Sequence, residues 1–278
     1  MLSRSSLSLG VAAAAVLGAC KKPAPTAQAA ATVITVTGTE FAFAAPDTVP
    51  AGLVTLRFLD SGQEPHQVVV MRLDSGKTMA DLQTMMADPE APIPAWLAFP
   101  IGVSVIAPGD SGNATALLSP GHYAMACFIA SPDGTPHIMK GMVRPFEVAA
   151  NAATPAPEPT ADITITEKDY DFEVTGPLTA GTHTIRVDNA GPQLHEVALN
   201  QLAPGKTLAD FQAWVQGGMK GEPPAKPVGG VTGPDVGGHQ FFTATLAAGK
   251  YVLICFVPDR GDRKPHFMHG MIKEITVS

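Results

Sequence analysis

The chain has 278 residues, of which 45% are apolar and 15% are charged, and this length exceeds the usual size of one folded domain and predicts two. Its 27 glycines and 26 prolines favour short strands joined by turns and exclude collagen and coiled coils. The net charge of −7 repels phosphate, so we predict no nucleic-acid partner.

The first feature along the chain is an apolar run from Leu7 to Ala19 that follows Arg4. Its thirteen residues are too few to span a bilayer, which takes roughly 20, so the run is typical of an export signal. Small residues precede Cys20, and this ending resembles the lipobox of bacterial lipoproteins. The resemblance implies a signal peptide over 1–20, lipidation of Cys20, and a membrane-anchored chain in the periplasm or elsewhere outside the cytoplasm of a bacterial envelope. Cleavage elsewhere, with Cys20 discarded, is the alternative.

Two segments have the composition of linkers, rich in Pro, Ala and Thr with nothing to pack. They cover 21–31 and 150–160. The longer segments that they delimit, 32–149 and 161–278, are the two predicted domains.

The two predicted domains match each other residue by residue. Their landmark residues pair at an offset of 128 or 129 positions, which indicates a duplicated domain, because the repeats of a solenoid are roughly 20 to 50 residues long. The pairs that carry metal-binding chemistry are His66 with His195, Cys127 with Cys255, His137 with His266, and Met142 with Met271.

Each predicted domain begins with alternating apolar and polar residues, at 34–37 and 163–166, as half-buried strands do. One short helix is predicted in each, where Thr78 or Thr207 precedes an aspartate by three residues in the manner of a capping box. The fold class predicted is therefore all-β, with one inserted helix in each domain.

The chemistry is concentrated after one of these strands. Period-2 alternation over 121–127 places Cys127 at the end of a buried strand. A loop of nine residues leads from it to His137, and four residues separate that histidine from Met142. The second domain repeats the pattern with a loop of ten residues. Two imidazoles, a thiolate and a weak axial thioether form the trigonal set that holds blue copper.

At these residues the chain resembles the cupredoxins, the type 1 blue copper family, once in each domain. The resemblance implies two tandem Greek-key β-sandwiches that transfer single electrons at copper, with up to two ions per chain. It implies the ligands His66, Cys127, His137 and Met142 in the first domain and His195, Cys255, His266 and Met271 in the second. The loops are longer than in plastocyanin-like or azurin-like members, and the closest pattern is the type 1 site of copper nitrite reductases.

Neither cysteine has a histidine beside it, whereas such a histidine connects type 1 copper with the catalytic metal in nitrite reductases and multicopper oxidases. We therefore predict that the protein is not an enzyme and that it exchanges electrons with redox partner proteins of the envelope. One alternative is a Cu(I) chaperone, storage or resistance protein, which the His-x-Met sequences at 137–139 and 266–268 favour. The other is a metal-free scaffold with a cupredoxin-like fold.

Overall fold

The computed structural model describes residues 30–88 and 91–278. The predicted signal peptide, the lipidation site Cys20 and most of the linker 21–31 lie outside the described residues. Strands dominate the described part of the chain, which confirms the all-β prediction. No helix within it is long and apolar enough to cross a membrane.

Within residues 30–88 and 91–278, the first half of the chain contributes nine strands and the second half contributes eight. Those of the first half are β1 (Thr32–Thr39), β2 (Ala42–Ala44), β3 (Thr48–Pro50), β4 (Gly52–Asp60), β5 (His66–Leu73), β6 (Leu97–Ile106), β7 (Ser111–Leu118), β8 (Gly121–Ala126) and β9 (Val143–Ala149). Those of the second half are β10 (Ile163–Lys168), β11 (Asp171–Thr175), β12 (Gly181–Asn189), β13 (Val197–Leu202), β14 (Ala225–Val231), β15 (His239–Leu246), β16 (Gly249–Ile254) and β17 (Ile272–Val277).

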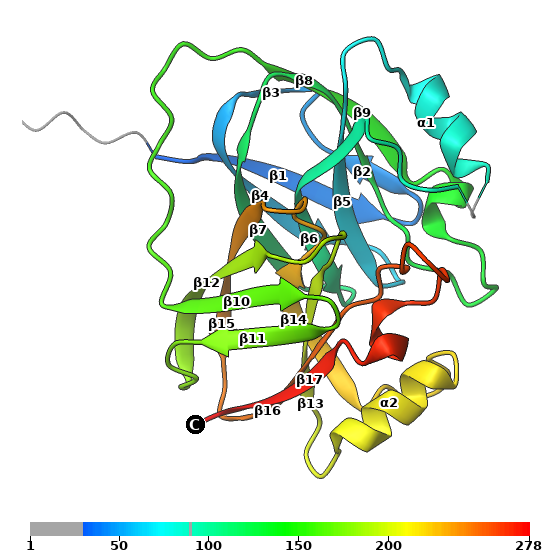
Figure 1. Ribbon diagram of the computed structural model, residues 1–278, viewed down its shortest axis with the longest axis vertical. Coiled ribbons are helices and arrows are strands. Elements are labelled where there is room, and N and C mark those ends of the chain that lie inside the picture. Colours follow the sequence, from blue (N-terminus) through cyan, green and yellow to red (C-terminus); the bar gives the residue numbers. More distant parts are fainter. Residues whose placement is uncertain (1–29, 89–90) are drawn as a thin grey trace, which may run out of the picture.

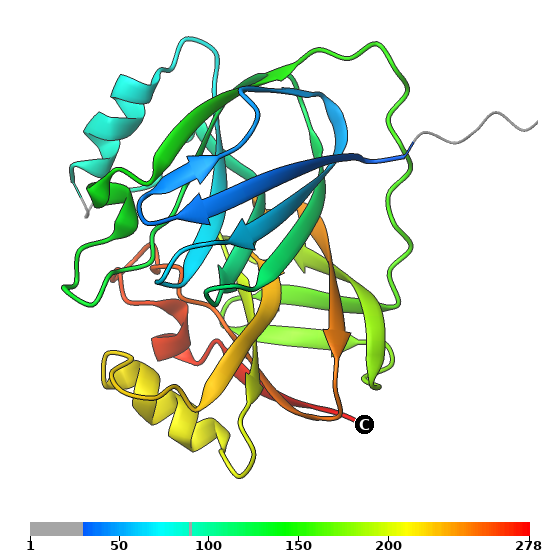
Figure 2. The same ribbon diagram turned by 180° about the vertical axis from the view of Figure 1, so that it is seen from behind.

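Two sheets run through both halves of the chain. One has the strand order β11-β10-β12-β15-β7-β4-β1-β2, and the other has the order β17-β16-β13-β14-β6-β5-β8-β9-β3. The halves join where Phe241 of β15 pairs with Thr115 of β7, and where Val231 of β14 pairs with Val103 of β6. The two halves therefore meet edge to edge in both sheets, one above the other in Figures 1 and 2. We call this junction the seam.

A row of four valines crosses the seam inside the nine-stranded sheet. Val68 lies opposite Val103, Val103 opposite Val231, and Val231 opposite Val197. Each of them is fully buried, and all belong to one hydrophobic cluster that draws on both halves. Alternating strand sequences place branched side chains on one buried face of a sheet. Because this cluster contains residues of both halves, the two halves share a core.

Gly102 of β6 lies at a close approach in the seam. A Cβ atom there would lie 1.8 Å from Thr232 Oγ1 and 2.6 Å from the carbonyl oxygen of Val68. The Thr232 hydroxyl donates to that carbonyl at 3.3 Å, and the Gly102 N–H donates to the buried side chain of Gln240 at 2.9 Å. Glycine at this position is therefore a requirement of the seam.

Replacing Gly102 with Ala is expected to lower the free energy of unfolding by about 1–3 kcal/mol, the usual cost of overpacking a filled core. Urea denaturation of the metal-free protein measures it. Ser111→Ala, an exposed change in β7, is the control and should stay within about 0.5 kcal/mol of the parent. Equal stability of the two variants would show that the seam tolerates a methyl group there.

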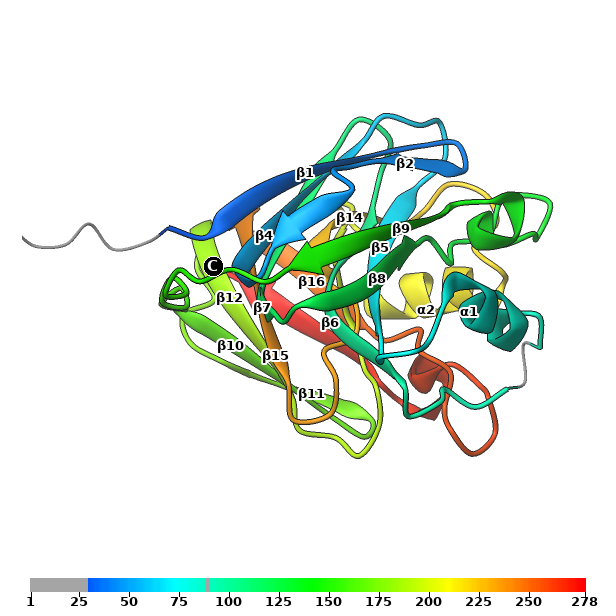
Figure 3. The same ribbon diagram turned by 90° about the horizontal axis from the view of Figure 1, so that it is seen from above.

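Both predicted helices form, as α1 (Met79–Met86) and α2 (Leu208–Gln216). Thr78 and Thr207 are their N-caps, and each completes a capping box with the aspartate three residues on. Leu82 of α1 and Phe211 of α2 are buried against the nine-stranded sheet. In Figure 3 the helices lie at one end of the molecule and the segment 150–160 lies at the other.

Candidate metal centres

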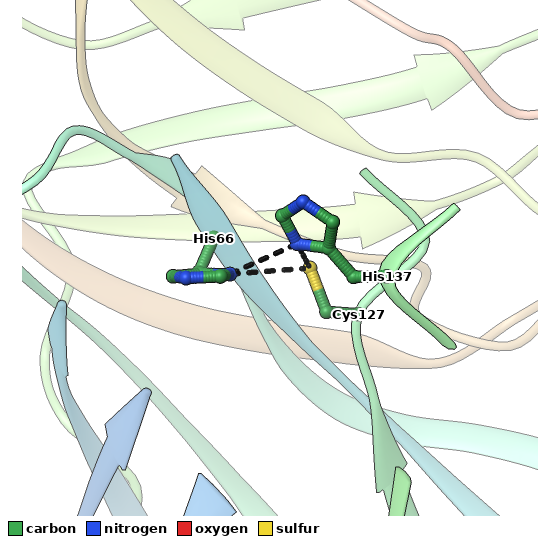
Figure 4. A group of neighbouring side chains, drawn as sticks. All are labelled: His66, Cys127 and His137. Carbon is green, nitrogen blue, oxygen red and sulfur yellow. Dashed lines mark hydrogen bonds between the residues drawn. The ribbon is translucent and has the colours of Figure 1, made fainter. Parts of the chain in front are cut away.

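The first predicted ligand set converges beside the nine-stranded sheet. His66 begins β5, Cys127 directly follows β8, and His137 begins the 3-10 helix η1 (His137–Lys140). Strands β5 and β8 are paired neighbours, so the strand histidine and the cysteine are adjacent in space. Figure 4 shows the three side chains pointing toward one another.

The donor atoms of this set have the spacing of metal ligands. The Nδ1 atoms of His66 and His137 are 3.0 Å apart, and Cys127 Sγ lies 3.4 Å from His137 Nδ1 and 3.9 Å from His66 Nδ1. Nitrogen and sulfur donors lie about 2.0–2.3 Å from a transition metal, and at trigonal angles this separates two donors by roughly 3.5 Å. All three side chains are fully buried. The observed distances bracket the expected value, so the set fits one ion.

The second set repeats this geometry in the other half. His195 Nδ1 and His266 Nδ1 are 3.0 Å apart, and Cys255 Sγ lies 3.4 Å from His266 Nδ1. The three ligand atoms lie within 4.8 Å of one another, and all three residues are fully buried. His266 begins the 3-10 helix η2 (His266–His269). The structure thus brings together the two imidazoles and the cysteine that the sequence pattern predicts in each half.

Backbone hydrogen bonds hold the loop ligands in place. The Cys127 N–H donates to the carbonyl of Met142 at 3.2 Å, the Met142 N–H to that of His137 at 2.9 Å, and the Ile138 N–H to that of Cys127 at 2.8 Å. The second half has the same three bonds, from Cys255 to Met271 at 3.2 Å, Met271 to His266 at 3.1 Å and Phe267 to Cys255 at 3.0 Å. Each ligand loop is therefore already organised by the fold.

The two predicted methionine ligands lie in the same core as the cysteines. Met142 and Met271 are fully buried and belong to the hydrophobic cluster that contains Cys127 and Cys255. The methyl end of Met142 packs near Gly38 of β1. Buried thioethers of this kind are suited to the weak axial position of a copper site.

Burial sets the protonation of the metal-free sites. It raises the pKa of Cys127 to about 11 and that of Cys255 well above its usual range. It also lowers the pKa of His66, and together with the neighbouring His195 it lowers the pKa of His266 to about 4. The imidazoles of His66 and His266 thus keep free lone pairs at neutral pH, and a metal that binds displaces the thiol proton.

The types of donor atom in each group indicate which metal it fits. Two imidazole nitrogens and one cysteine sulfur in a buried, compact arrangement are the in-plane ligands of type 1 copper. Both cysteines are free of disulfide bonds, so both sulfurs are available. The two buried His-Cys-His groups fit type 1 copper, up to two ions per chain.

Carboxylates at the sites were missed by sequence reasoning. Glu64 contacts His137 and Asp169 contacts His195, one predicted ligand histidine in each set. Glu64 stands two residues before His66, but Asp169 stands far from any ligand in the sequence. No spacing rule connects them, and only the folded geometry shows both.

Glu167 is a fully buried carboxylate of β10 in the second half. Neither of its oxygens has a hydrogen-bond partner among the described residues. Burial, with the nearby Glu196 and Asp188, raises its pKa well above the usual range. A carboxyl whose pKa is higher in the folded protein than in the unfolded chain destabilises the fold as the pH rises above its pKa in the unfolded chain.

Glu167→Met, which keeps the side-chain length and removes the unsatisfied carboxyl, is expected to stabilise the metal-free protein at pH 8 by about 1–3 kcal/mol. The gain should be smaller at pH 5, where the carboxyl retains more of its proton. Urea denaturation at both pH values measures it, with the exposed Glu222→Gln as control. A gain that is equal at the two pH values would contradict the assignment of a charge penalty to Glu167.

No family model and no curated protein matches this chain. Among solved structures, an auracyanin from Roseiflexus castenholzii is 23% identical, with 44% of this chain and 99% of that chain covered and a TM-score of 0.32. Auracyanin A, a blue copper protein from Chloroflexus aurantiacus, is 18% identical, with 44% and 100% covered and a TM-score of 0.30. A blue copper oxidase from Nitrosomonas europaea is 16% identical, with 88% and 85% covered and a TM-score of 0.26. The case for copper therefore comes from the side chains described above.

One prediction is corrected by these neighbours. They include oxidases and a copper-containing nitrite reductase that align with 88% of this chain, which contradicts the prediction that the protein is not an enzyme. That prediction relied on the missing histidine beside each cysteine. The criterion was too narrow, because catalytic centres are also built from residues that lie far apart in the sequence.

Proposed function

We propose that this chain is a copper protein of the cupredoxin type that exchanges single electrons with redox proteins. It would consist of two Greek-key domains, 32–149 and 161–278, joined by the linker 150–160, with one type 1 copper in each. The observation that carries the proposal is the convergence, once in each half, of two buried imidazoles and a buried thiol whose donor atoms lie within 4.8 Å of one another.

The residues proposed to hold copper are the same types in both halves. They are His66, Cys127, His137 and Met142 in the first and His195, Cys255, His266 and Met271 in the second. Copper bound there supplies one-electron chemistry. The buried ligands exclude water from the ion, and the backbone bonds of each loop keep the ligands fixed, which supports electron exchange with little rearrangement.

Exposed apolar side chains beside the ligands support docking of a redox partner. Phe128 follows Cys127 and is 40% exposed, and Met139 lies two residues after His137 and is 63% exposed. In the second half Met268 is 56% exposed beside His266. A protein that docks at these residues would come close to the buried ligands, and apolar side chains are what such interfaces bury.

The location of the chain in the envelope is part of the proposal. The apolar run and the small residues before Cys20 support export and lipid anchoring. Mass spectrometry of the mature N-terminus tests this. An acylated Cys20 is expected, and an unmodified N-terminus at another residue would remove the anchor.

A Cu(I) carrier is the second candidate, favoured by the exposed thioethers of Met139 and Met268, since sulfur ligands suit the monovalent ion. Cyclic voltammetry of the copper-loaded chain separates the two. Electron exchange predicts a reversible one-electron wave and copper that stays bound in the presence of a competing Cu(I) ligand. A carrier predicts rapid loss of copper to that ligand, and a metal-free scaffold predicts no wave.

A further inference from the structure

Each ligand histidine has a carboxylate on the side away from its metal-facing nitrogen. In the first half, Glu64 Oε2 lies 2.9 Å from His137 Nε2, and Glu40 Oε1 lies 3.9 Å from His66 Nε2. In the second half, Asp169 Oδ1 lies 2.7 Å from His195 Nε2, and Asp259 Oδ2 lies 3.8 Å from His266 Nε2. The ligand set of each half therefore faces two carboxylates.

The carboxylates beside His66 and His195 come from equivalent positions of the two halves. Glu40 and Asp169 stand 129 residues apart, which is the offset between His66 and His195. The side chain is one methylene shorter in the second half, yet the oxygen still reaches the imidazole. The acidic group at this position has been kept while its length has changed.

The carboxylate beside the loop histidine comes from different positions in the two halves. In the first half it is Glu64, which lies beside Ser131. The equivalent residues of the second half are Gln193 and Asp259, so the acidic group has exchanged places with a neutral one. The bridges that pair Ala130 with Pro136 and Pro258 with Pro265 confirm that Ser131 and Asp259 occupy equivalent places.

In the second half, the carboxylate of Asp259 is held by neighbouring side chains. Gln193 Nε2 donates to Asp259 Oδ2 at 2.9 Å, and the Tyr170 hydroxyl donates to the same oxygen at 2.6 Å. The aromatic ring at this place is also retained, because Phe41 packs edge-on against His137 and Tyr170 packs in the same way against His266. A carboxylate near the loop histidine has thus been supplied twice, by different residues.

From this pattern, and given the copper sites of the proposed function, we infer that Glu40, Glu64, Asp169 and Asp259 are positioning residues for the copper-binding imidazoles. Glu64 hydrogen-bonds Nε2 of His137 at 2.9 Å, and a carboxylate that accepts the Nε2–H fixes the tautomer, so that Nδ1 keeps its lone pair for the metal, and orients the ring. The oxygens of Glu40, Asp169 and Asp259 face their imidazoles at 3.9, 2.7 and 3.8 Å without hydrogen-bond geometry, so these three act through their negative charge. The negative charge also favours the more highly charged copper ion.

The two sites are tuned through different histidines. The short contact is on His137, the histidine after the cysteine, in the first half and on His195, which precedes β13, in the second. Removal of Glu64 should therefore affect the first site more than removal of Glu40, and removal of Asp169 should affect the second site more than removal of Asp259.

The test uses full-length chains that carry Cys255→Ser, so that only the first site forms. Glu64→Gln is expected to weaken Cu(II) binding 10- to 100-fold, the usual effect of losing such a partner, and to raise the reduction potential. Glu40→Gln is the matched control and should weaken binding less. Competition with a chelator of known affinity measures the binding, and voltammetry measures the potential.

A rescue variant separates this role from a loss of folding. Glu64→Gln combined with Ser131→Asp places a carboxylate where the second half has Asp259, 3.8 Å from its histidine, and should recover part of the lost affinity and of the shift in potential. Parent-like affinity and potential in Glu64→Gln, or no recovery in the double variant, would overturn the inference. If the Cys255→Ser parent binds no copper, the proposed function fails instead, so the two failures are distinguishable.

Discussion

Replacing Cys127 with Ser is expected to lower the tightly bound copper from two ions to one per chain and to remove the first site's share of the visible thiolate-to-copper absorption. A serine hydroxyl does not supply the soft anionic sulfur that this metal prefers. Cys255→Ser should do the same at the second site, and the double variant should lose the absorption entirely. Copper analysis after dialysis against a chelator, combined with the optical spectrum, measures both effects.

Met139→Leu is the matched control for these variants. Met139 lies two residues from the ligand His137 but is 63% exposed, and it is not among the proposed ligands. Its replacement should leave both the stoichiometry and the spectrum unchanged. An absorption band that survives in the Cys127→Ser, Cys255→Ser double variant would show that the buried sulfurs do not bind the metal.

Copper loading is expected to raise the free energy of unfolding by about 4 kcal/mol per site when free copper exceeds the dissociation constant a thousandfold. The reason is that His66, Cys127 and His137 come from separate strands and loops, so the unfolded chain does not present the set. In a domain of 150–250 residues each kcal/mol shifts the melting temperature by about 2–4 °C. Calorimetry of the metal-free and copper-loaded chains measures the shift.

The double cysteine variant is the control for this shift. Its imidazoles remain, so any stabilisation that comes from copper bound at the surface or by histidines alone should persist in this variant. The account predicts that most of the rise in melting temperature disappears. An equal rise in the parent and the double variant would place the bound copper somewhere other than at Cys127 and Cys255.

Most of each predicted ligand set stands in one local pattern of the sequence, which contains the cysteine, the histidine after it and the methionine. Alternation identifies the strand that ends just before Cys127, and the loop that follows has nearly the same length in the two halves, nine and ten residues. The helix caps at Thr78 and Thr207 were predictable for the same reason, since a capping box is a contact over three residues. Internal duplication doubled each of these signals.

The seam was not predictable in the same way. It depends on edge strands that belong to different halves, and strand edges pair without any fixed spacing in the sequence. Gly102 marks the place, but a glycine in a strand indicates a close approach without naming the partner. The contact with Thr232 appears only in the folded chain.

The carboxylates that face the histidines of the two sites, and the two 3-10 helices, were also not predicted from the sequence. Asp169 reaches His195 through tertiary structure alone. The turns η1 and η2 are four residues long, too short for a periodic signal. Their one local sign is the glycine that follows each of them, Gly141 or Gly270, whose positive φ is readily adopted by glycine.

X-ray absorption spectroscopy at the copper edge of the fully loaded, oxidised chain tests the central claim most directly. The account predicts two copper ions per chain, each with one sulfur and two imidazole nitrogens at about 2.0–2.3 Å. A copper environment built only from nitrogen and oxygen, with no sulfur at bonding distance, would contradict it.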